Sequence, residues 1–377
     1  MPPVGWLNDP NGLCQFQDVY HIFYQYAPLD AEGKALKGWG HYTTKDFIHY
    51  CQEPIALFPD QPIDQDGAYS GCSWVENEKV YFFYTGNIKW KGNYDYINEG
   101  RGHYVNSFSS DDGYHFSDKV NLLKNEDYPK DLSCHVRDPK VFQEQGTYYM
   151  VLGARTLKSQ GCVLIYRSSD LKNWEYFDRL TTPQPFGYMW ECPDLFEINH
   201  QKILMTCPQG LKQEGYHYEN VYANGYFLVN GPITNMSLQD FQELDYGFDF
   251  YAPQTFEDQK KRRILIGWLG LPDIPYTNPT VKRGWQHALT LPRELTFKNG
   301  HLYQYPIEDI LSLKKHTHHV ELSKDYIFHN HQVVCECHFY DLPDEWQMKL
   351  RDDVQLSYQG EVLTLQMGES GYGRESR

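Results

Sequence analysis

The sequence WLNDPNG, residues 6–12, places one carboxylate inside a run of residues that restrict the backbone. Its proline favours an extended conformation for Asp9, and the Asn-Gly pair that follows is typical of turns. Taken alone, the motif indicates an Asx-type turn that leads into a strand. Two more acids, Asp138 and Glu191, also stand just before a proline that opens an apolar run. This recurrence favours a shared function for the three acids.

Five segments of the chain share one pattern. Each has an acid, amide or small residue, a Gly or Pro, an apolar strand, a polar turn and an aromatic-rich strand. They are spaced by roughly 55 to 70 residues, a period that favours the blades of a propeller over solenoid repeats. The segments are 12–26, 69–86, 138–153, 193–206 and 252–268.

A second pattern recurs between these segments, in which an Asp-led turn joins a strand end to an aromatic residue. It occurs at 43–50, 109–116 and 168–174. With four strands per repeat, the sequence predicts an all-β protein whose residues 1–300 form a five-bladed β-propeller. A pair of β-sandwiches is the alternative, but equally spaced strand heads favour radial repetition. Helical periodicity is nearly absent, and only 307–314 predicts a short helix.

The C-terminal part has a different character. We expect residues 301–320 to form a linker and 321–377 to begin a β-sandwich domain. Because few strands accumulate before the end of the sequence, we expect this domain to be truncated. Three histidines in the linker could in principle bind a metal, but no acid or cysteine has ligand spacing, so a solvated linker is the favoured interpretation. They are His316, His318 and His319.

Composition narrows the class of protein. Mean hydropathy is −0.65 and no apolar run has membrane-spanning length, which predicts a soluble protein. The net charge of −16 argues against nucleic acid or an anionic membrane as a partner. The 31 Tyr, 20 Phe and 9 Trp suit strands and also sugar binding by ring stacking.

Cysteine usage bears on the compartment. The nine cysteines lack paired spacing, which indicates free thiols in a reducing cytoplasm. No signal peptide is visible at the start of the sequence, although the early motif leaves open a longer natural chain. The sequence does not indicate an oligomeric state.

The predicted architecture brings the three acids together. In a propeller the first strand of each blade lines the central channel, so Asp9, Asp138 and Glu191 would face one funnel. Three carboxylates in one funnel repel each other and raise one another's pKa. Glycoside hydrolysis explains such a set, because it needs one protonated carboxyl and one ionised carboxyl. The alternative is three exposed turn acids on separate loops.

Six ordered motifs resemble the β-fructofuranosidases of glycoside hydrolase family 32, the invertase family. Within the family, 135–142 and 264–272 look most like the bacterial sucrose-6-phosphate hydrolases. The family's fold, a five-bladed propeller followed by a β-sandwich, agrees with the repeats. The motifs are WLNDPNG at 6–12, FYQ at 23–25, WGH at 39–41, RDP at 137–139, ECP at 191–193 and WQHALTLPREL at 285–295.

The resemblance implies a retaining double displacement that needs no metal and no cofactor. Asp9 would be the nucleophile, and Glu191 the general acid and then the general base. Asp138 would hold fructose hydroxyls and stabilise the transition state, with Arg137 beside it setting the local charge.

The resemblance also implies a set of substrate-binding residues. Asn8 and Gln25 would hydrogen-bond the fructose ring, and Trp39 and Trp268 are candidate stacking walls, although a lone Trp is more often a core residue. Tyr69 and Ser70 stand where the family usually has Phe-Ser. Many family members have a further Trp shortly before WGH, and residues 30–37 have none. This difference affects the expected leaving-group subsite and leaves the fructose subsite unchanged.

The expected substrate is a small sugar, sucrose 6-phosphate or sucrose. A phosphate on glucose would lie at the outer rim of the funnel, where basic loop residues could meet it. The nearest ones in chain order are Lys34, Lys37, Lys89, Lys91 and Arg101, each of which could also be ordinary solvated charge.

Other functions remain open. They are an invertase, fructan hydrolase or fructosyltransferase without a phosphate site, and a propeller arabinosidase. A lectin-like propeller that binds fructosides without cleaving them is a non-enzymatic alternative. It is disfavoured because a binding protein gains nothing from a protonated Glu beside an ionised Asp.

Overall fold

The computed structural model describes residues 1–319, 321, 336–341, 343–350 and 353–368. The chain divides into two compact units, Met1–Ile310 and Leu311–Arg377. Regular structure in the described ranges is β, apart from three short 3-10 helices, so the prediction of an all-β protein is confirmed. These helices are η1 (Asn125–Asp127), η2 (Pro279–Arg283) and η3 (Glu308–Leu313).

The third 3-10 helix confirms the short helix predicted at 307–314. Over the residues that the structure describes, no helix is long and apolar enough to cross a membrane.

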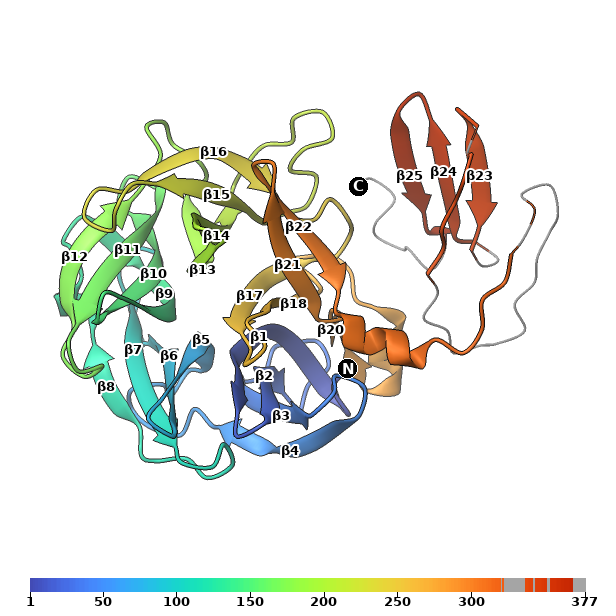
Figure 1. Cartoon of the computed structure of the whole chain (residues 1–377). Helices are drawn as coiled ribbons and strands as arrows, with labels where there is room; N and C mark the ends of the chain where they lie inside the picture. The colour runs from blue at the N-terminus through green and yellow to red at the C-terminus, as the bar shows by residue number, and fades with distance from the viewer. Residues whose placement is uncertain (320, 322–335, 342, 351–352, 369–377) are drawn as a thin grey trace. The chain divides into compact units, whose positions relative to one another are not determined.

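The first unit contains five mainly antiparallel sheets (Figure 1). The first has β1 (Gly5–Phe16), β2 (Val19–Ala27), β3 (Gly38–Thr44) and β4 (Tyr50–Leu57). The second has β5 (Ala68–Glu76), β6 (Lys79–Lys89), β7 (Arg101–Ser110) and β8 (Val120–Leu123). The third has β9 (Leu132–Glu144), β10 (Thr147–Thr156), β11 (Gly161–Ser168) and β12 (Glu175–Leu180).

The fourth sheet has β13 (Met189–Ile198), β14 (Gln201–Gln209), β15 (Gly225–Asn230) and β16 (Ser237–Glu243). The fifth has β17 (Tyr251–Glu257), β18 (Arg263–Leu269), β21 (Arg293–Lys298) and β22 (His301–Pro306). A short β20 (Ala288–Leu289) also pairs with β18. Because β22 pairs with β21, the predicted linker over 301–320 begins inside the fifth sheet.

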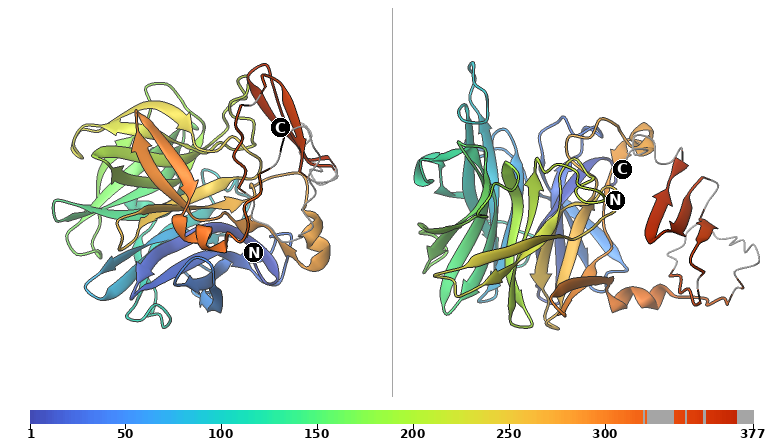
Figure 2. Two further views of the ribbon diagram at one scale, coloured as in Figure 1. Left: turned by 45° about the vertical axis from the view of Figure 1, so that its right-hand side comes forward. Right: turned by 90° about the horizontal axis from the view of Figure 1, so that it is seen from above.

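The first strand of each sheet lies at the centre of the unit, and we call β1, β5, β9, β13 and β17 the inner strands. β1 contacts β5, β5 contacts β9, β9 contacts β13, β13 contacts β17, and β17 contacts β1. The inner strands therefore form a closed ring, with the other strands of each sheet outside it (Figures 1 and 2).

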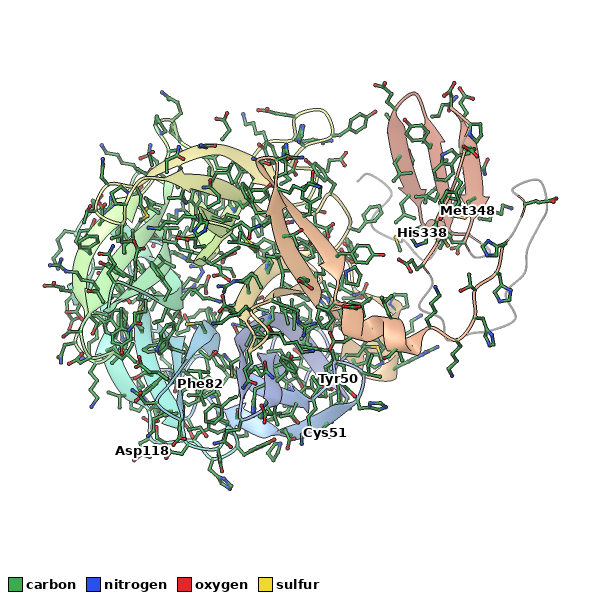
Figure 3. The ribbon with its side chains drawn as sticks, in the orientation of Figure 1. Tyr50, Cys51, Phe82, Asp118, His338 and Met348 are labelled. Atoms are coloured by element: carbon green, nitrogen blue, oxygen red, sulfur yellow. The ribbon has the colours of Figure 1, made fainter. Side chains whose placement is uncertain are left out.

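A separate hydrophobic cluster fills the space between each pair of neighbouring sheets. In β10, Met150 and Leu152 pack toward the second sheet, whereas Val151 packs toward the fourth. Phe82 of β6, labelled in Figure 3, packs toward the first sheet with Trp39. Since successive strand residues point to opposite faces, a sheet covered on both sides needs the continuous apolar runs seen in the sequence.

The ring is closed by a short parallel pairing. β19 (Trp285–Gln286) pairs with β1 through the partners Gly5 and Trp285, and the Gly5 amide donates to the Gly284 carbonyl at 2.7 Å. The inner strand β1 therefore has β2 on one side and β19 on the other.

Each inner strand has a β-bulge. Three of the bulges hold a non-glycine residue with positive φ, at Asp138 (63°), Cys192 (48°) and Ala252 (47°). Bulges re-aim side chains, and backbone in this region is costly for residues with a Cβ. The bulged pairs are Asn8-Asp9, Tyr69-Ser70, Asp138-Pro139, Cys192-Pro193 and Ala252-Pro253.

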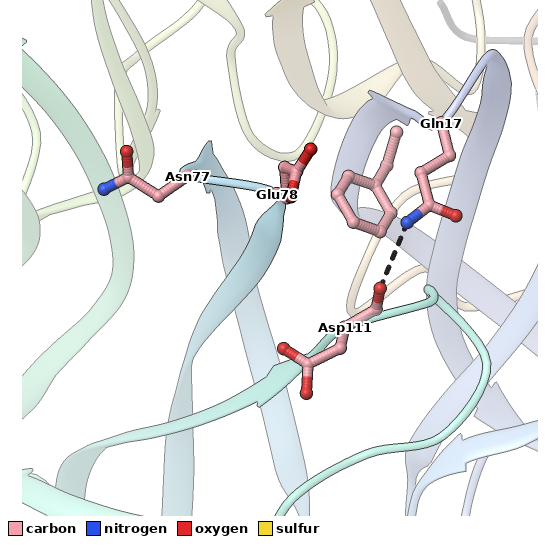
Figure 4. A pocket seen from close by; sticks show the side chains of 5 residues that line it. Gln17, Asn77, Glu78 and Asp111 are labelled. Atoms are coloured by element: carbon pink, nitrogen blue, oxygen red, sulfur yellow. Dashed lines mark hydrogen bonds between the residues drawn. The ribbon is translucent and has the colours of Figure 1, made fainter.

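The opposite end of the inner strands carries two-residue hairpin turns. Gln17 and Asp18 have φ of 46° and 61°, and Asn77 and Glu78 have 50° and 59°, which matches type I′ turns. Gln17, Asn77, Glu78 and Asp111 line a polar hollow at this end, where the Gln17 amide donates to the Asp111 carbonyl at 3.1 Å (Figure 4). This hollow is separated from the bulges by the length of the strands.

The described part of the second unit contains one antiparallel sheet. Its strands are β23 (Trp346–Lys349), β24 (Gln355–Gln359) and β25 (Val362–Gln366). Part of the predicted sandwich domain, 321–377, falls outside the described residues. A β-sandwich over 321–377 stays a prediction.

Candidate active site

The bulges place all three predicted acids around one residue, Cys192. It follows Glu191 in β13, and its backbone amide donates to Asp138 Oδ2 at 2.9 Å. Its Sγ lies 3.9 Å from Asp9 Oδ2. Asp9 comes from the first sheet, Asp138 from the third and Glu191 from the fourth. The acids are therefore gathered at one end of the ring and do not occupy separate loops.

Asp9 is held by two neutral donors. Ser70 Oγ donates to Asp9 Oδ2 at 2.5 Å, and Asn8 Nδ2 donates to Oδ1 at 3.0 Å. Burial raises the pKa of Asp9 above its ordinary value, and these two hydrogen bonds act against that rise. The bonds favour the ionised carboxylate, the form that a nucleophile requires.

An amide chain fixes the side of the site next to Asp9. Asn8 Nδ2 also donates to Gln25 Oε1, and Trp6 Nε1 donates to Asn8 Oδ1 at 2.8 Å. Asn8 and Gln25 are buried. The two predicted amides therefore lie together beside the carboxylate. The half-buried Trp6, which the sequence did not indicate as a site residue, joins this group through its hydrogen bond to Asn8.

Asp138 occupies the bulge of the third sheet. Its backbone amide donates to Thr85 Oγ1 at 2.9 Å, which anchors the residue at its positive φ. Burial raises the pKa of Asp138 to about 7; Glu191 and Asp9 add to the rise, and Arg137 and the Cys192 amide oppose it. A carboxyl with this pKa can donate or accept a hydrogen bond near neutral pH.

Four donors surround Glu191. Arg137 donates to Oε1 from Nε at 2.9 Å and from Nη2 at 2.6 Å. Gln209 Nε2 and Tyr251 Oη donate to Oε2 at 2.7 and 2.5 Å. The carboxyl is therefore fixed in direction by groups from three sheets.

Arg137 is itself supported by a histidine. Its Nη1 lies 2.6 Å from His135 Nδ1, which must be unprotonated to accept from a guanidinium. Burial first, and then the charge of Arg137, lower the pKa of His135 to about 3. The predicted role of Arg137, setting charge beside Asp138, therefore has a second part, since its hydrogen bonds go to Glu191.

The sequence did not indicate Gln209 or Tyr251 as site residues. A signal existed for Tyr251, which stands two positions before Pro253 as Glu191 stands two positions before Pro193, at the head of the next repeat. Gln209 ends β14 without any motif, so its role depends on the pairing of β14 with β13.

The two predicted stacking walls are not on open faces. Trp39 has no exposed surface, and its indole Nε1 donates to the Tyr69 carbonyl at 3.0 Å. Trp268 is 2% exposed, and its Nε1 contacts His287 Nδ1 at 2.6 Å. Because a ring without an exposed face cannot stack on a sugar, we correct this part of the prediction: both rings support the site from the core.

The remaining predicted residues, Tyr69 and Ser70, form the bulge of β5 in the second sheet. Ser70 contacts Asp9, as described above, whereas partly buried Tyr69 has its ring centroid 5.8 Å from that of His103. Among the described residues, no cluster of three or more His, Cys, Asp or Glu side chains could hold a metal ion.

A carboxylate with neutral donors near a carboxyl held by arginine, both of them partly exposed, is the arrangement of a glycoside hydrolase. The comparisons agree. The family described as "Glycosyl hydrolases family 32 N-terminal domain" matches residues 1–306, and the chain belongs to this family.

Similar proteins include two curated bacterial enzymes named sucrose-6-phosphate hydrolase. The one from Bacillus subtilis (strain 168) is 40% identical over 332 residues, which cover 86% of this chain and 67% of that protein. The one from Vibrio alginolyticus is 42% identical over 321 residues, which cover 83% and 63%. The chain thus spans about two thirds of the length of these relatives.

The fold is also similar to that of a solved enzyme structure. The sucrose-6-phosphate hydrolase from Lactobacillus gasseri superposes with a TM-score of 0.74 at 34% identity. The match covers 82% of this chain and 62% of that protein.

Proposed function

We propose that the protein is a retaining β-fructofuranosidase that acts on sucrose 6-phosphate, and that its five sheets are the blades of a five-bladed β-propeller followed by a truncated β-sandwich. The observation that carries the proposal is the meeting of Asp9, Asp138 and Glu191 around Cys192. The names of the similar bacterial proteins, each a sucrose-6-phosphate hydrolase, support this choice of substrate.

The first step is displacement of the leaving sugar. Asp9, ionised and aimed by Ser70 and Asn8, attacks the anomeric carbon of the fructosyl unit. The bond to the glycosidic oxygen breaks as Glu191 gives that oxygen a proton. The products of this step are a fructosyl ester on Asp9, the free leaving sugar and an ionised Glu191.

The second step returns the enzyme to its starting state. Glu191 accepts a proton from a water molecule, which attacks the anomeric carbon and releases fructose and the Asp9 carboxylate. Arg137, Gln209 and Tyr251 hold Glu191 in one position, so the same carboxyl can serve as acid and then as base.

Asp138 has a supporting role. With a pKa raised to about 7, it can hold fructose hydroxyls as donor or acceptor while positive charge develops on the ring. The buried amides Asn8 and Gln25 complete the fructose side, and Trp6 offers the half-buried ring nearest to them.

The test is product analysis on sucrose, sucrose 6-phosphate and inulin in parallel. We expect fructose from the two sucrose substrates with a higher kcat/KM for sucrose 6-phosphate, and NMR should show that the released fructose first has the substrate's anomeric configuration. Oligosaccharides at high sucrose would indicate a fructosyltransferase instead. Absence of cleavage with retained sugar binding would indicate a lectin-like protein.

A further inference from the structure

Three basic residues meet at the rim between the first and second sheets. Lys37 precedes β3, Lys89 ends β6 and Arg101 begins β7. Lys89 and Arg101 are direct cross-strand partners. The Lys37 carbonyl accepts the Ala68 amide at 2.9 Å, which joins the loop of Lys37 to the head of β5. We call these three residues the rim cations.

The rim cations have no carboxylate partner in the described part of the chain. Lys37 Nζ donates to the Gly33 carbonyl at 2.9 Å and lies 5.7 Å from the centroid of the Trp6 ring. Arg101 Nε is buried without a hydrogen-bond partner. Asp66 accepts the backbone amide of Lys89 at 2.7 Å and forms no ion pair with its side chain.

The rim cations concentrate positive charge at one place in a chain of net charge −16. Two lysines on the same elements differ from the rim cations in having an acidic partner. Lys34, in the loop before β3, pairs with Glu32, and Lys79, at the opposite end of β6 from Lys89, pairs with Asp111 at 3.0 Å. The rim cations are therefore a local exception to the acidic character of the chain.

The same residues adjoin the active site. Burial lowers the pKa of Lys37, Asp9 and Asp30 raise it, and Lys89 lowers it further. Burial also lowers the pKa of Arg101, which Tyr69 raises and Arg137 lowers. Contacts agree with this. Lys37 lies over the ring of Trp6, which donates to Asn8 beside Asp9. His103, two residues after Arg101 in β7, packs against His135, which contacts Arg137. A bound anion would relieve the repulsion between the cations.

We propose that Lys37, Lys89 and Arg101 form the subsite for a phosphate group on the leaving sugar. The inference rests on the proposed function and adds the residues that select the phosphorylated substrate. The leaving sugar must lie beside Glu191, whose arginine neighbours Arg101, so a substituent on that sugar extends toward the rim. A guanidinium fork with two ammonium groups suits a phosphate dianion.

The structure also divides the five basic residues that the sequence indicated. Lys34 is exposed and its charge is matched by Glu32. Lys91 is exposed in the loop beyond Lys89. These two lysines belong to the same loops as Lys37 and Lys89, so they serve as matched controls.

The test compares kcat/KM for sucrose 6-phosphate and for sucrose in Lys89→Met and Arg101→Met. Each change should lower the ratio of the two values about tenfold, the effect of one charge-assisted hydrogen bond. The control variants Lys34→Met and Lys91→Met should keep the parent ratio, and Arg101→Lys should recover part of it. Lys89 is exposed, so its replacement should not disturb the core. The Lys89→Met result therefore stays informative even if Arg101→Met fails to fold.

Calorimetric titration with inorganic phosphate tests the subsite without turnover. The parent should bind phosphate, and Lys89→Met and Arg101→Met should each bind it about tenfold more weakly. Equal phosphate binding in parent and variants, or an unchanged substrate ratio, would overturn the subsite and leave the β-fructofuranosidase intact. Loss of cleavage of both sugars by the parent would instead contradict the proposed function.

Discussion

Two groups of acidic residues in the first unit differ in where their hydrogen bonds come from. The acids of the inner strands depend on hydrogen bonds from distant positions, since Asp9 and Ser70 are 61 residues apart and Arg137 and Glu191 are 54 apart, and only Asn8 donates to Asp9 from the next position. The acids of the outer turns bond within three residues. In the first of these turns, Asp46 Oδ1 accepts the amides of Ile48 and His49, both at 2.8 Å.

The pKa shifts of the two groups are opposite. Burial raises the pKa of Asp9 and Asp138. The His49 side chain and the amides of the turn hold the pKa of Asp46 well below its usual range, and the same pattern recurs at Asp112 and Asp170. The outer acids stabilise local structure. The inner acids lower the stability of the fold, because burial disfavours their charge, and they are kept for the chemistry of the site.

The largest expected effect is the loss of turnover in Asp9→Asn and in Glu191→Gln. Both changes are near-isosteric, so the fold should persist while kcat falls by about four orders of magnitude. Steady-state kinetics and circular dichroism measure the two quantities. Asp112→Asn is the matched control, because it makes the same chemical change in an outer turn. Activity within a few-fold of the parent in either inner variant would refute the assigned roles.

The next effect is on stability, in Asp138→Asn. A raised carboxyl pKa means that the folded protein binds more protons than the unfolded chain between about pH 4 and pH 7. The parent should therefore lose stability as pH rises through this window, and the variant should not. Its Tm should exceed that of the parent by an amount that grows up to about pH 7 and is constant above.

Differential scanning calorimetry at pH 4, 5.5, 7 and 8 measures this difference in Tm. The variant should be less active, which distinguishes a functional carboxyl from a merely strained one. A variant that is less stable than the parent at pH 8 would show that the contacts of Asp138 outweigh the cost of burying its charge.

The smallest effect is expected in the outer turns. Asp46→Asn, Asp112→Asn and Asp170→Asn should each lower Tm slightly at pH 7 with no change in kcat/KM. Because the folded pKa is depressed, this contribution is present above the unfolded value of 3.8 and is lost as pH falls below it. The Tm difference should therefore shrink on acidification, the opposite of the trend for Asp138→Asn. A fall in activity would remove the distinction between the two groups.

The contrast between local and distant contacts also explains which features could be predicted from the sequence. An acid before a proline, in a repeat that opens an apolar strand, is a local signal, and it located Asp9, Asp138 and Glu191. The outer turns were equally visible, because all their hydrogen bonds lie within a few residues. The apolar runs of the strands indicated sheets covered on both faces.

The rest of the site depends on contacts between sheets. Gln209 reaches Glu191 only because β14 pairs with β13, and no motif marks it. Trp39 and Trp268 were predicted to stack on the sugar. Both rings instead pack in hydrophobic clusters between the sheets, where the space accommodates large side chains. Whether an aromatic ring is exposed is set by tertiary packing, which residue type does not reveal.

The pairing of β1 with β19 has a consequence for biosynthesis. Asp9 lies four residues beyond Gly5, whose partner Trp285 is made about 280 residues later, on the order of tens of seconds at ordinary translation rates. Until then the strand that carries the nucleophile lacks one of its two neighbours. A ribosome-bound chain that stops short of residue 285 should already have folded sheets but no competent nucleophile, so activity should appear as a late, single event in synthesis.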